Sequence, residues 1–139
     1  REIQTLYVQK EIFIAAPPEI VFETLLSPPG RFSEMNLKIE PFPGGRWYRD
    51  LGNNTGHLWG HVQVIKPPTL LELVGPMFMS YAVSSHIQYR LNGEGKNTRL
   101  VMTHQAIGLI ADEHIQGVKA GWGELLANIQ AGAEAKLRG

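Results

Sequence analysis

The carboxyl-terminal end of the chain carries the pattern that most limits its fold. Apolar side chains recur there at steps of three and four residues, at Ile115, Val118, Trp122, Leu125, Leu126, Ile129 and Ala133. This spacing predicts a long amphipathic helix with one apolar face. Asp112 is a suitable N-cap for it, because its side chain can accept hydrogen bonds from free backbone N–H groups. The rest of the chain must supply a surface that covers the apolar face of this helix.

The residues before this helix are typical mainly of strands. Alternation of apolar and polar side chains predicts strands over 5–15, 37–42, 46–51, 58–65, 70–74, 81–91 and 98–106. Pro17 and Pro18 end the first strand, and proline suits the first turn of a short helix over 18–26. The predicted layout is α+β: a strand, a short helix, about six antiparallel strands and a long helix follow one another along the chain. In such a layout the last helix lies across the one apolar face of a curved sheet.

Length and composition predict one domain over residues 1–139. A chain of this length with 43% hydrophobic residues buries a proper core. The absence of cysteine excludes a disulfide scaffold, a thiolate zinc site and a thiol nucleophile, and is compatible with the reducing cytoplasm, where we expect the protein. The net charge of zero means that the chain has no excess of positive charge with which to bind the phosphates of a nucleic acid. No apolar run is long enough to span a membrane.

A series of short motifs extends over nearly the whole chain. They are residues 12–22, Pro43-Gly44-Gly45-Arg46, Gly60-His61-Val62, Pro67-Pro68 with 70–72, Thr98-Arg99-Leu100 with Thr103-His104, and Gly121-Trp122. In this order and spacing the sequence resembles the START-like, or SRPBCC, superfamily, and within it the branch similar to the activator of heat-shock-protein ATPase (AHSA-like). One departure is Phe22, where that branch often has tryptophan. The resemblance implies a helix-grip fold, with a curved antiparallel sheet of six to seven strands around the long C-terminal helix.

The hairpin formed by 81–91 and 98–106 indicates which side chains face the interior. An even-numbered loop would place Leu91 opposite Thr98 and Tyr89 opposite Leu100. His104 would then point inward beside Ser85. The predicted inner face collects Tyr81, Val83, Ser85, Ile87, Tyr89, Leu91, Leu100, Met102, His104 and Ala106.

The same parity applied to the turn at 52–56 places Trp47 over Gly60 and points Arg49 inward. Trp59 would lie on the outer face near Tyr48. This turn contains two asparagines and two glycines and could hold a bulge, which would change the register. If the register slips by one, Arg49 is solvated instead.

Gly121, Gly132 and His114 fall along one edge of the apolar stripe of the long helix. These glycines serve either close packing against the sheet or a space between helix and sheet. Such a space would be an apolar cavity with a few polar groups, which is what a small-molecule site requires. The predicted ligand-binding residues are Trp47, Arg49, Tyr81, Ser85, Tyr89, Met102, His104, Gly121 and Trp122.

Residues for catalysis or metal binding do not converge in this pattern. His104 is either a hydrogen-bonded core histidine or the group that orients a ligand. An inward Arg49 would need an anion, such as a ligand carboxylate or phosphate. His57 and His61 lie about 13 Å apart on a strand, too far to ligate one metal ion. We therefore predict no metal, no cofactor, and no hydrolytic or metal-dependent enzyme.

Three functions fit these observations. The preferred one is binding of a small hydrophobic molecule, lipid-like or aromatic, as a carrier or sensor. The alternatives, which the resemblance brings in, are an enzyme similar to polyketide cyclases and aromatases, and a co-chaperone-like protein-interaction module. The segment 75–79 contains two methionines and Phe78, and could form a lid or the contact of a homodimer.

Overall fold

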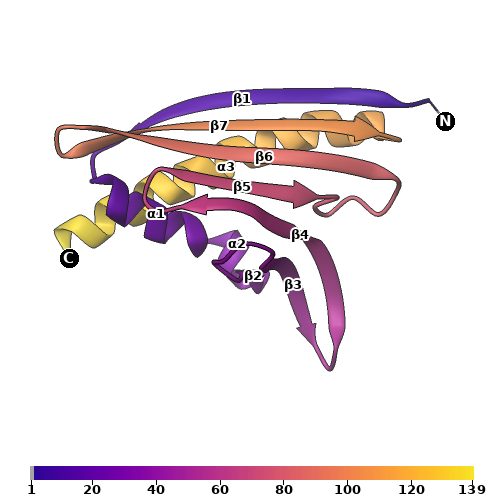
Figure 1. Ribbon diagram of the computed structural model, residues 1–139, viewed down its shortest axis with the longest axis horizontal. Coiled ribbons are helices and arrows are strands. Elements are labelled where there is room, and N and C mark those ends of the chain that lie inside the picture. Colours follow the sequence, from indigo (N-terminus) through magenta and orange to yellow (C-terminus); the bar gives the residue numbers. More distant parts are fainter. Residues whose placement is uncertain (1) are drawn as a thin grey trace.

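The computed structural model describes residues 2–139 and contains one seven-stranded antiparallel sheet with three helices (Figure 1). The strands follow each other across the sheet in the order β1, β7, β6, β5, β4, β3, β2. The elements are β1 (Gln4–Ile14), α1 (Pro18–Leu26), α2 (Arg31–Glu34), β2 (Leu37–Ile39), β3 (Arg46–Gly52), β4 (Thr55–Lys66), β5 (Leu70–Gly75), β6 (Val83–Glu94), β7 (Asn97–Gly108) and α3 (Asp112–Arg138). The predicted α+β helix-grip architecture is confirmed.

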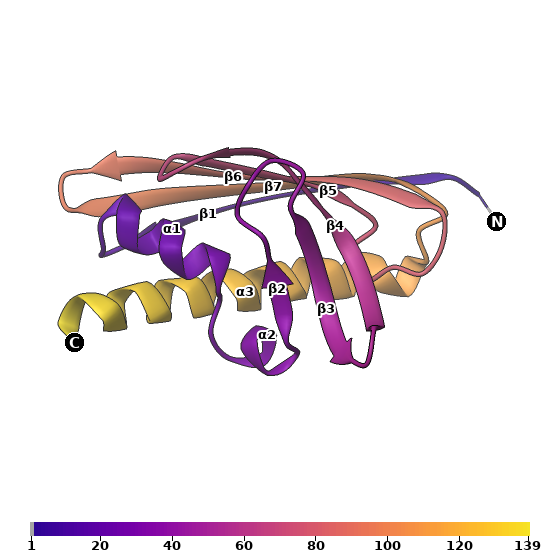
Figure 2. The ribbon, with the colours of Figure 1, turned by 60° about the horizontal axis from the view of Figure 1, so that its bottom comes forward.

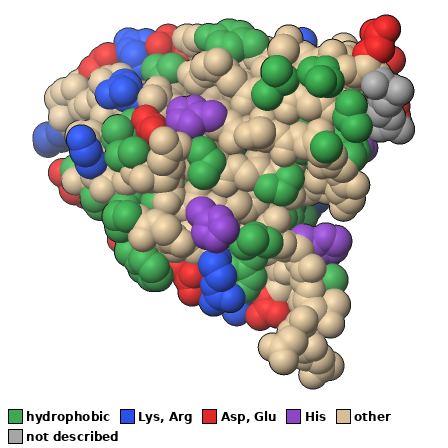
Figure 3. All heavy atoms as spheres, turned by 45° about the vertical axis from the view of Figure 1, so that its right-hand side comes forward, with side chains coloured by type: hydrophobic (Ala, Val, Ile, Leu, Met, Phe, Trp, Pro, Cys, Tyr) green, Lys and Arg blue, Asp and Glu red, His purple; other side chains and the backbone are tan. Residues whose placement is uncertain are grey.

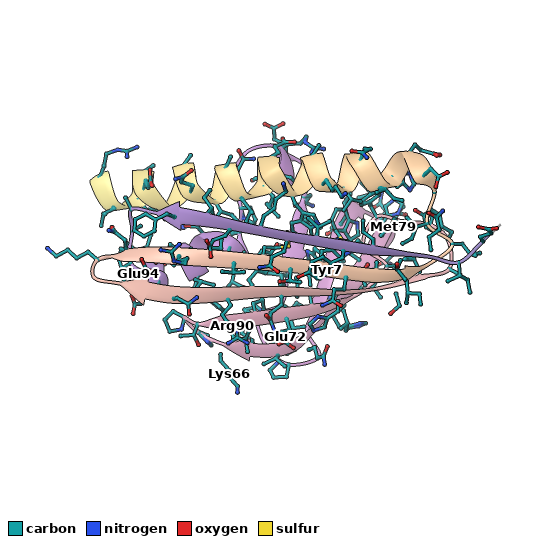
Figure 4. The ribbon with its side chains drawn as sticks, turned by 90° about the horizontal axis from the view of Figure 1, so that it is seen from above. Tyr7, Lys66, Glu72, Met79, Arg90 and Glu94 are labelled. Carbon is teal, nitrogen blue, oxygen red and sulfur yellow. The ribbon has the colours of Figure 1, made fainter. Side chains whose placement is uncertain are left out.

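The long helix α3 lies along the concave side of the sheet. Figure 2 shows β2, β3 and β4 crossing over α3, with α1 beside it. The side chains of α3 that are buried follow the predicted stripe, at Val118, Trp122, Leu126, Ile129 and Ala133. On the sheet, Glu72 and Arg90 point away from α3, whereas Met79 lies between the sheet and the helix (Figure 4). The core is therefore the layer between this helix and the inner face of the sheet.

The β6–β7 hairpin has the predicted faces but a different pairing. Glu94 pairs with Asn97 across a two-residue turn, so Leu91 lies opposite Leu100 rather than Thr98. The reason is local, because Gly95 adopts a φ of +67° and closes a turn shorter than expected. The pairing differs by two residues, and side chains alternate with a period of two, so the inner face is unchanged.

The β3–β4 pair contains a bulge that changes which side chains face inward. Trp47 pairs with Gly60 as predicted, but the next pairs are Tyr48 with Leu58 and Arg49 with His57. Trp59 is the extra residue, and its side chain is buried. The prediction that Trp59 lies on the outer face is wrong, because the bulge turns it into the core.

The helices differ from the sequence-based expectation in two places. Helix α3 begins at Asp112 itself, and Ala111 occupies the N-cap position without a side-chain hydrogen bond. The Asp112 carboxylate instead accepts a hydrogen bond from Nε2 of Gln4, 3.0 Å away. The short helix α2 was not predicted, since a single turn shows no periodicity. Within residues 2–139, none of the helices is both long and apolar enough to cross a bilayer.

Candidate functional site

A pocket of about 380 Å³ lies between α3 and the part of the chain that curves around it. Its walls come from α2 and β2, from β3 and β4, from the loop between β5 and β6, and from the first half of α3. The lining residues are Arg31, Phe32, Met35, Leu37, Trp47, Trp59, Met77, Phe78, Glu113, His114, Gly117, Val118, Gly121, Trp122 and Leu125. Most of these side chains are apolar, as in small-molecule sites of proteins.

Two glycines of α3 border this space, Gly121 half-buried and Gly117 exposed. A Cβ atom built on Gly117 or Gly121 would have no neighbour within 4 Å. At Gly132, three turns further along, a Cβ would lie 2.9 Å from Cγ of Pro29 and 3.1 Å from Cγ2 of Thr24. Helix α3 is therefore packed closely against α1 at its carboxyl-terminal end, whereas in its first half the edge that carries Gly117 and Gly121 meets no neighbour. Close packing explains Gly132, and open space explains Gly121.

Aromatic rings form a continuous wall on one side of the pocket. The ring centroids of Trp47 and Trp59 are 5.3 Å apart, those of Trp59 and Phe78 are 6.1 Å apart, and those of Phe78 and His114 are 5.5 Å apart. The first and third pairs meet edge to face, which is a favourable geometry for aromatic rings. Trp122 completes the lining, so all three tryptophans of the chain border the pocket.

The loop between β5 and β6 fixes Phe78 at the edge of the pocket. Gly60 and Gly75 allow its base to approach β4, because a Cβ on Gly75 would lie 2.3 Å from the carbonyl oxygen of Trp59. The backbone N–H of Met77 donates to the same carbonyl oxygen at 2.9 Å. Met77 and Met79 are buried, whereas Phe78 is 41% exposed. The segment that the sequence presented as a lid or dimer contact thus contributes Met77 and Phe78 to the pocket.

Charge is confined to the rim of the pocket. Arg31 and Glu113 are the charged side chains of the lining. Arg31 donates two hydrogen bonds to the carboxylate of Glu124, from Nη2 at 2.7 Å and from Nε at 3.1 Å. These bonds hold the pKa of Glu124 below its usual value. Arg31 is therefore neutralised by Glu124, and it ties α2 to α3 beside the pocket.

Figure 3 shows the end of the molecule from which the β3–β4 hairpin projects. Hydrophobic side chains are spread over the centre of this face, with histidine side chains among them. The charged side chains lie mainly toward its margins.

His104 belongs to the core and uses both of its ring nitrogens there. The indole Nε1–H of Trp122 donates to Nδ1 of His104 at 2.9 Å, so the proton of the neutral ring must lie on Nε2. Nε2–H then donates to Oγ of Ser85, 3.0 Å away. Burial lowers the pKa of His104 to about 4, because the charged ring would lose its hydration. With its proton on the nitrogen that faces Ser85, this histidine cannot take a proton from that hydroxyl, and the pair has no access to solvent.

The predicted ligand-binding residues occupy three different environments. Trp47, Gly121 and Trp122 line the pocket, and the hydroxyl of Tyr81 contacts the pocket residue His114. Four others are buried on the inner face of the sheet and do not line this pocket, namely Ser85, Tyr89, Met102 and His104. Tyr89 instead borders a recess of about 30 Å³, and burial raises the pKa of its hydroxyl.

Arg49 does not reach the apolar pocket. Its Nε donates to the carbonyl oxygen of Met35 at 3.2 Å, and it borders an open polar groove along the β3–β4 hairpin. The bulge at Trp59 shifts the pairing of Arg49 by one residue relative to the predicted register. Arg49 is half-buried on the same side of β3 as Trp47, but it is not part of the pocket lining, so its expected place inside the cavity is corrected.

Several pocket residues were missed or assigned elsewhere at the sequence level. Phe32, Met35 and Leu37 come from α2 and β2, which are too short to show a periodic pattern. The signal for His114 was present, since His114, Gly117, Val118, Gly121, Trp122 and Leu125 follow the three- and four-residue spacing of one helix face. In the part of the chain that the structure describes, no three His, Asp or Glu side chains are grouped so that they could hold a metal ion.

Comparison with known proteins places this geometry in a family. The sequence pattern of the family described as "Activator of Hsp90 ATPase homolog 1-like protein" matches residues 15–134. The chain belongs to this family. The match covers everything from the end of β1 to the last turns of α3, so the AHSA-like resemblance is confirmed. No protein of curated function shows significant sequence similarity to the chain.

Solved structures with the fold of this AHSA1-like chain come from distant relatives. An uncharacterised protein from Rhizobium leguminosarum has 18% identity and a TM-score of 0.71, with 96% of this chain and 97% of that chain covered. A protein of unknown function from Staphylococcus aureus has 12% identity and a TM-score of 0.71, with 99% of each chain covered. DynU16, a protein in the dynemicin biosynthetic locus, has 17% identity and a TM-score of 0.69, with 92% of this chain and 47% of that chain covered. At these identities the likeness concerns the fold alone.

Proposed function

We propose that this protein binds a small, largely apolar molecule in the pocket between α3 and the β2–β4 part of the sheet. Trp47, Gly121 and Trp122 would contact the ligand directly. The pocket volume of about 380 Å³ falls in the usual range for small-molecule sites. Membership of DynU16, a structural neighbour, in a biosynthetic locus is compatible with such a role.

The observation that carries this proposal is the apolar pocket opposite the tryptophan wall, where half-buried Gly121 meets no neighbour within 4 Å and Gly117 lies at the exposed edge. Protein interiors are normally filled by side chains, because burial and close packing both stabilise the fold. Glycine within a helix costs about 0.5 to 1 kcal/mol relative to alanine. A half-buried glycine at position 121 therefore lowers helix stability without serving close packing, and binding of a ligand would account for the space beside it.

Binding, rather than catalysis, fits the chemistry of the lining. Arg31, Glu113 and His114 are its ionisable side chains, and Arg31 is held by Glu124. The buried Ser85–His104 pair has its proton on the wrong nitrogen to activate the serine hydroxyl. A carrier or sensor needs only the apolar walls and a means of orientation.

Energy transfer from tryptophan to the uncharged naphthalene dye prodan tests this function. All three tryptophans border the pocket, so bound dye should quench their fluorescence and emit in turn. Gly121→Leu should fill the pocket and weaken dye binding by about tenfold or more, which corresponds to about 1.4 kcal/mol. The fold should survive, because leucine is a better helix former than glycine.

Gly123→Leu is the matched control, since Gly123 lies on the same helix, is exposed and does not line the pocket. This variant should bind prodan like the wild type. The proposal is wrong if the wild type binds no dye, or if both leucine variants affect binding equally.

A further inference from the structure

We infer that His114 is the hydrogen-bond donor that selects the ligand, and that the ligand class is an uncharged, planar aromatic molecule carrying an acceptor such as a carbonyl oxygen. This inference rests on the proposed function and adds the polar half of recognition to it. It follows from the surroundings of His114, from the charges at the rim and from the shape of the walls.

His114 is held at the start of α3 by two aromatic neighbours. The ring of Tyr81 lies nearly parallel to the imidazole, with an interplanar angle of 16° and a centroid distance of 5.6 Å. Phe78 meets the imidazole edge to face at 5.5 Å. The imidazole is also part of the pocket lining. Its position is therefore fixed before a ligand arrives, which lowers the entropic cost of a hydrogen bond to that ligand.

We infer which nitrogen of His114 carries the proton from the hydroxyl of Tyr81. The backbone N–H of Ala111 donates to this hydroxyl oxygen at 3.3 Å. The same hydroxyl lies 2.6 Å from Nδ1 of His114 and can donate its proton there. Nδ1 is then the acceptor, and the proton of the neutral imidazole lies on Nε2.

Nε2–H of His114 is available to a ligand. The hydrogen bond that the ring makes within residues 2–139 uses Nδ1. Among the same residues no buried side-chain nitrogen or oxygen lacks a partner, so Nε2 is not enclosed in the core. A donor that is accessible, fixed in direction and adjacent to an aromatic wall suits a carbonyl, ether or phenol oxygen.

The charges at the rim disfavour an anionic ligand. Glu113 is the neighbour of His114 in the sequence and also lines the pocket, and would repel an anion. Arg31, the one cationic lining residue among residues 2–139 besides the histidine, already binds the Glu124 carboxylate. The walls contributed by Trp47, Trp59 and Phe78 favour a flat ring system, which can pack against their faces and edges.

Two probes of the same shape separate this inference from the proposed function. Acetylnaphthalene and isopropenylnaphthalene, substituted at the same ring position, differ only in a C=O or C=CH₂ group. Each would compete with prodan for the wild-type protein. A single neutral hydrogen bond to His114 should favour the acetyl compound by about tenfold.

Variants assign this preference to one side chain. His114→Phe should bring the affinities of the two compounds to within about twofold of each other while isopropenylnaphthalene still binds. Replacing the exposed His61 in the same way, as His61→Phe, should leave the preference unchanged. Equal binding of both compounds to the wild type would overturn the role of His114 and leave the proposed function intact. If neither compound competes although prodan binds, the ligand class inferred here is wrong and the proposed function stands. If prodan does not bind either, both are wrong.

Nitrogen NMR of the His114 ring in the wild-type protein gives a second readout that needs no variant at position 114. Nε2 should carry the proton in the free protein, and its resonance should shift with acetylnaphthalene but not with isopropenylnaphthalene. Tyr81→Phe should remove the preference for this tautomer and reduce the selectivity for the acetyl compound. A proton on Nδ1 in the wild-type protein would contradict the inference.

Discussion

His104 joins three elements of the fold through its two ring nitrogens. It lies on β7, donates to Ser85 on β6 and accepts from the indole of Trp122 on α3. Both bonds are buried, where an unmade hydrogen bond costs about 1 to 3 kcal/mol. The histidine is therefore a structural link between the sheet and the helix next to the pocket.

This link should make the stability of the protein fall between about pH 6.5 and pH 4. The pKa of His104 is lowered from the usual 6.5 to about 4 in the folded state, so the unfolded chain binds a proton that the folded chain rejects. The contribution is fully present above pH 6.5, decreases as the pH falls toward 4, and amounts to about 3 kcal/mol at most. Urea unfolding at a series of pH values measures it.

His104→Gln provides the comparison for that series. Glutamine does not titrate, so the variant should be less stable at pH 7.5 and should lose less stability on acidification than the wild type. If the variant shows the same decrease between pH 6.5 and pH 4, the titration belongs to other groups.

At the scale of elements, α3 has a different role in each half. Its second half packs against α1, where Gly132 accommodates Pro29 and Thr24. Its first half borders the pocket through Gly117 and Gly121. The same residue type thus marks close contact at one end of the helix and empty space at the other.

Alanine substitutions should distinguish these glycines. Gly123→Ala places a methyl group in open space and should raise the free energy of unfolding by about 0.5 to 1 kcal/mol, through helix propensity alone. Gly132→Ala should lower it by about 1 to 3 kcal/mol, because the methyl group overlaps the ring of Pro29. Thermal or urea unfolding measures both, and equal stabilisation by the two variants would contradict the packing described here.

The strands show what could be predicted from the sequence and where prediction fails. The inner face of the β6–β7 hairpin, with Tyr89 and His104, was predictable because a pairing error of two residues preserves the alternation of side chains. The β3–β4 pair was not, because one extra residue at Trp59 exchanges the faces of β4 beyond it and turns Trp59 into the core. A bulge has no reliable signature in a single sequence.

At the scale of the whole molecule, one sheet serves two purposes around one helix. Strands β1, β7 and β6 extend along α3 and form the core with it, while β2, β3 and β4 cross over it (Figures 1 and 2). The pocket lies where the crossing strands, α2 and the β5–β6 loop meet the glycines of α3. The overall fold follows from the amphipathic helix and the strand order, but the pocket depends on a bulge, a single-turn helix and a loop.

Two-dimensional NMR of amide and indole N–H groups, recorded during a titration with acetylnaphthalene, tests most directly whether this pocket binds ligands. Binding there should shift the indole resonances of Trp47 and Trp59 and the amide resonances of Gly117 and Gly121, and leave those of Asn53 and Asn54 at the hairpin tip unchanged. Shifts confined to the hairpin groove, or no saturable shifts at all, would contradict binding in the pocket.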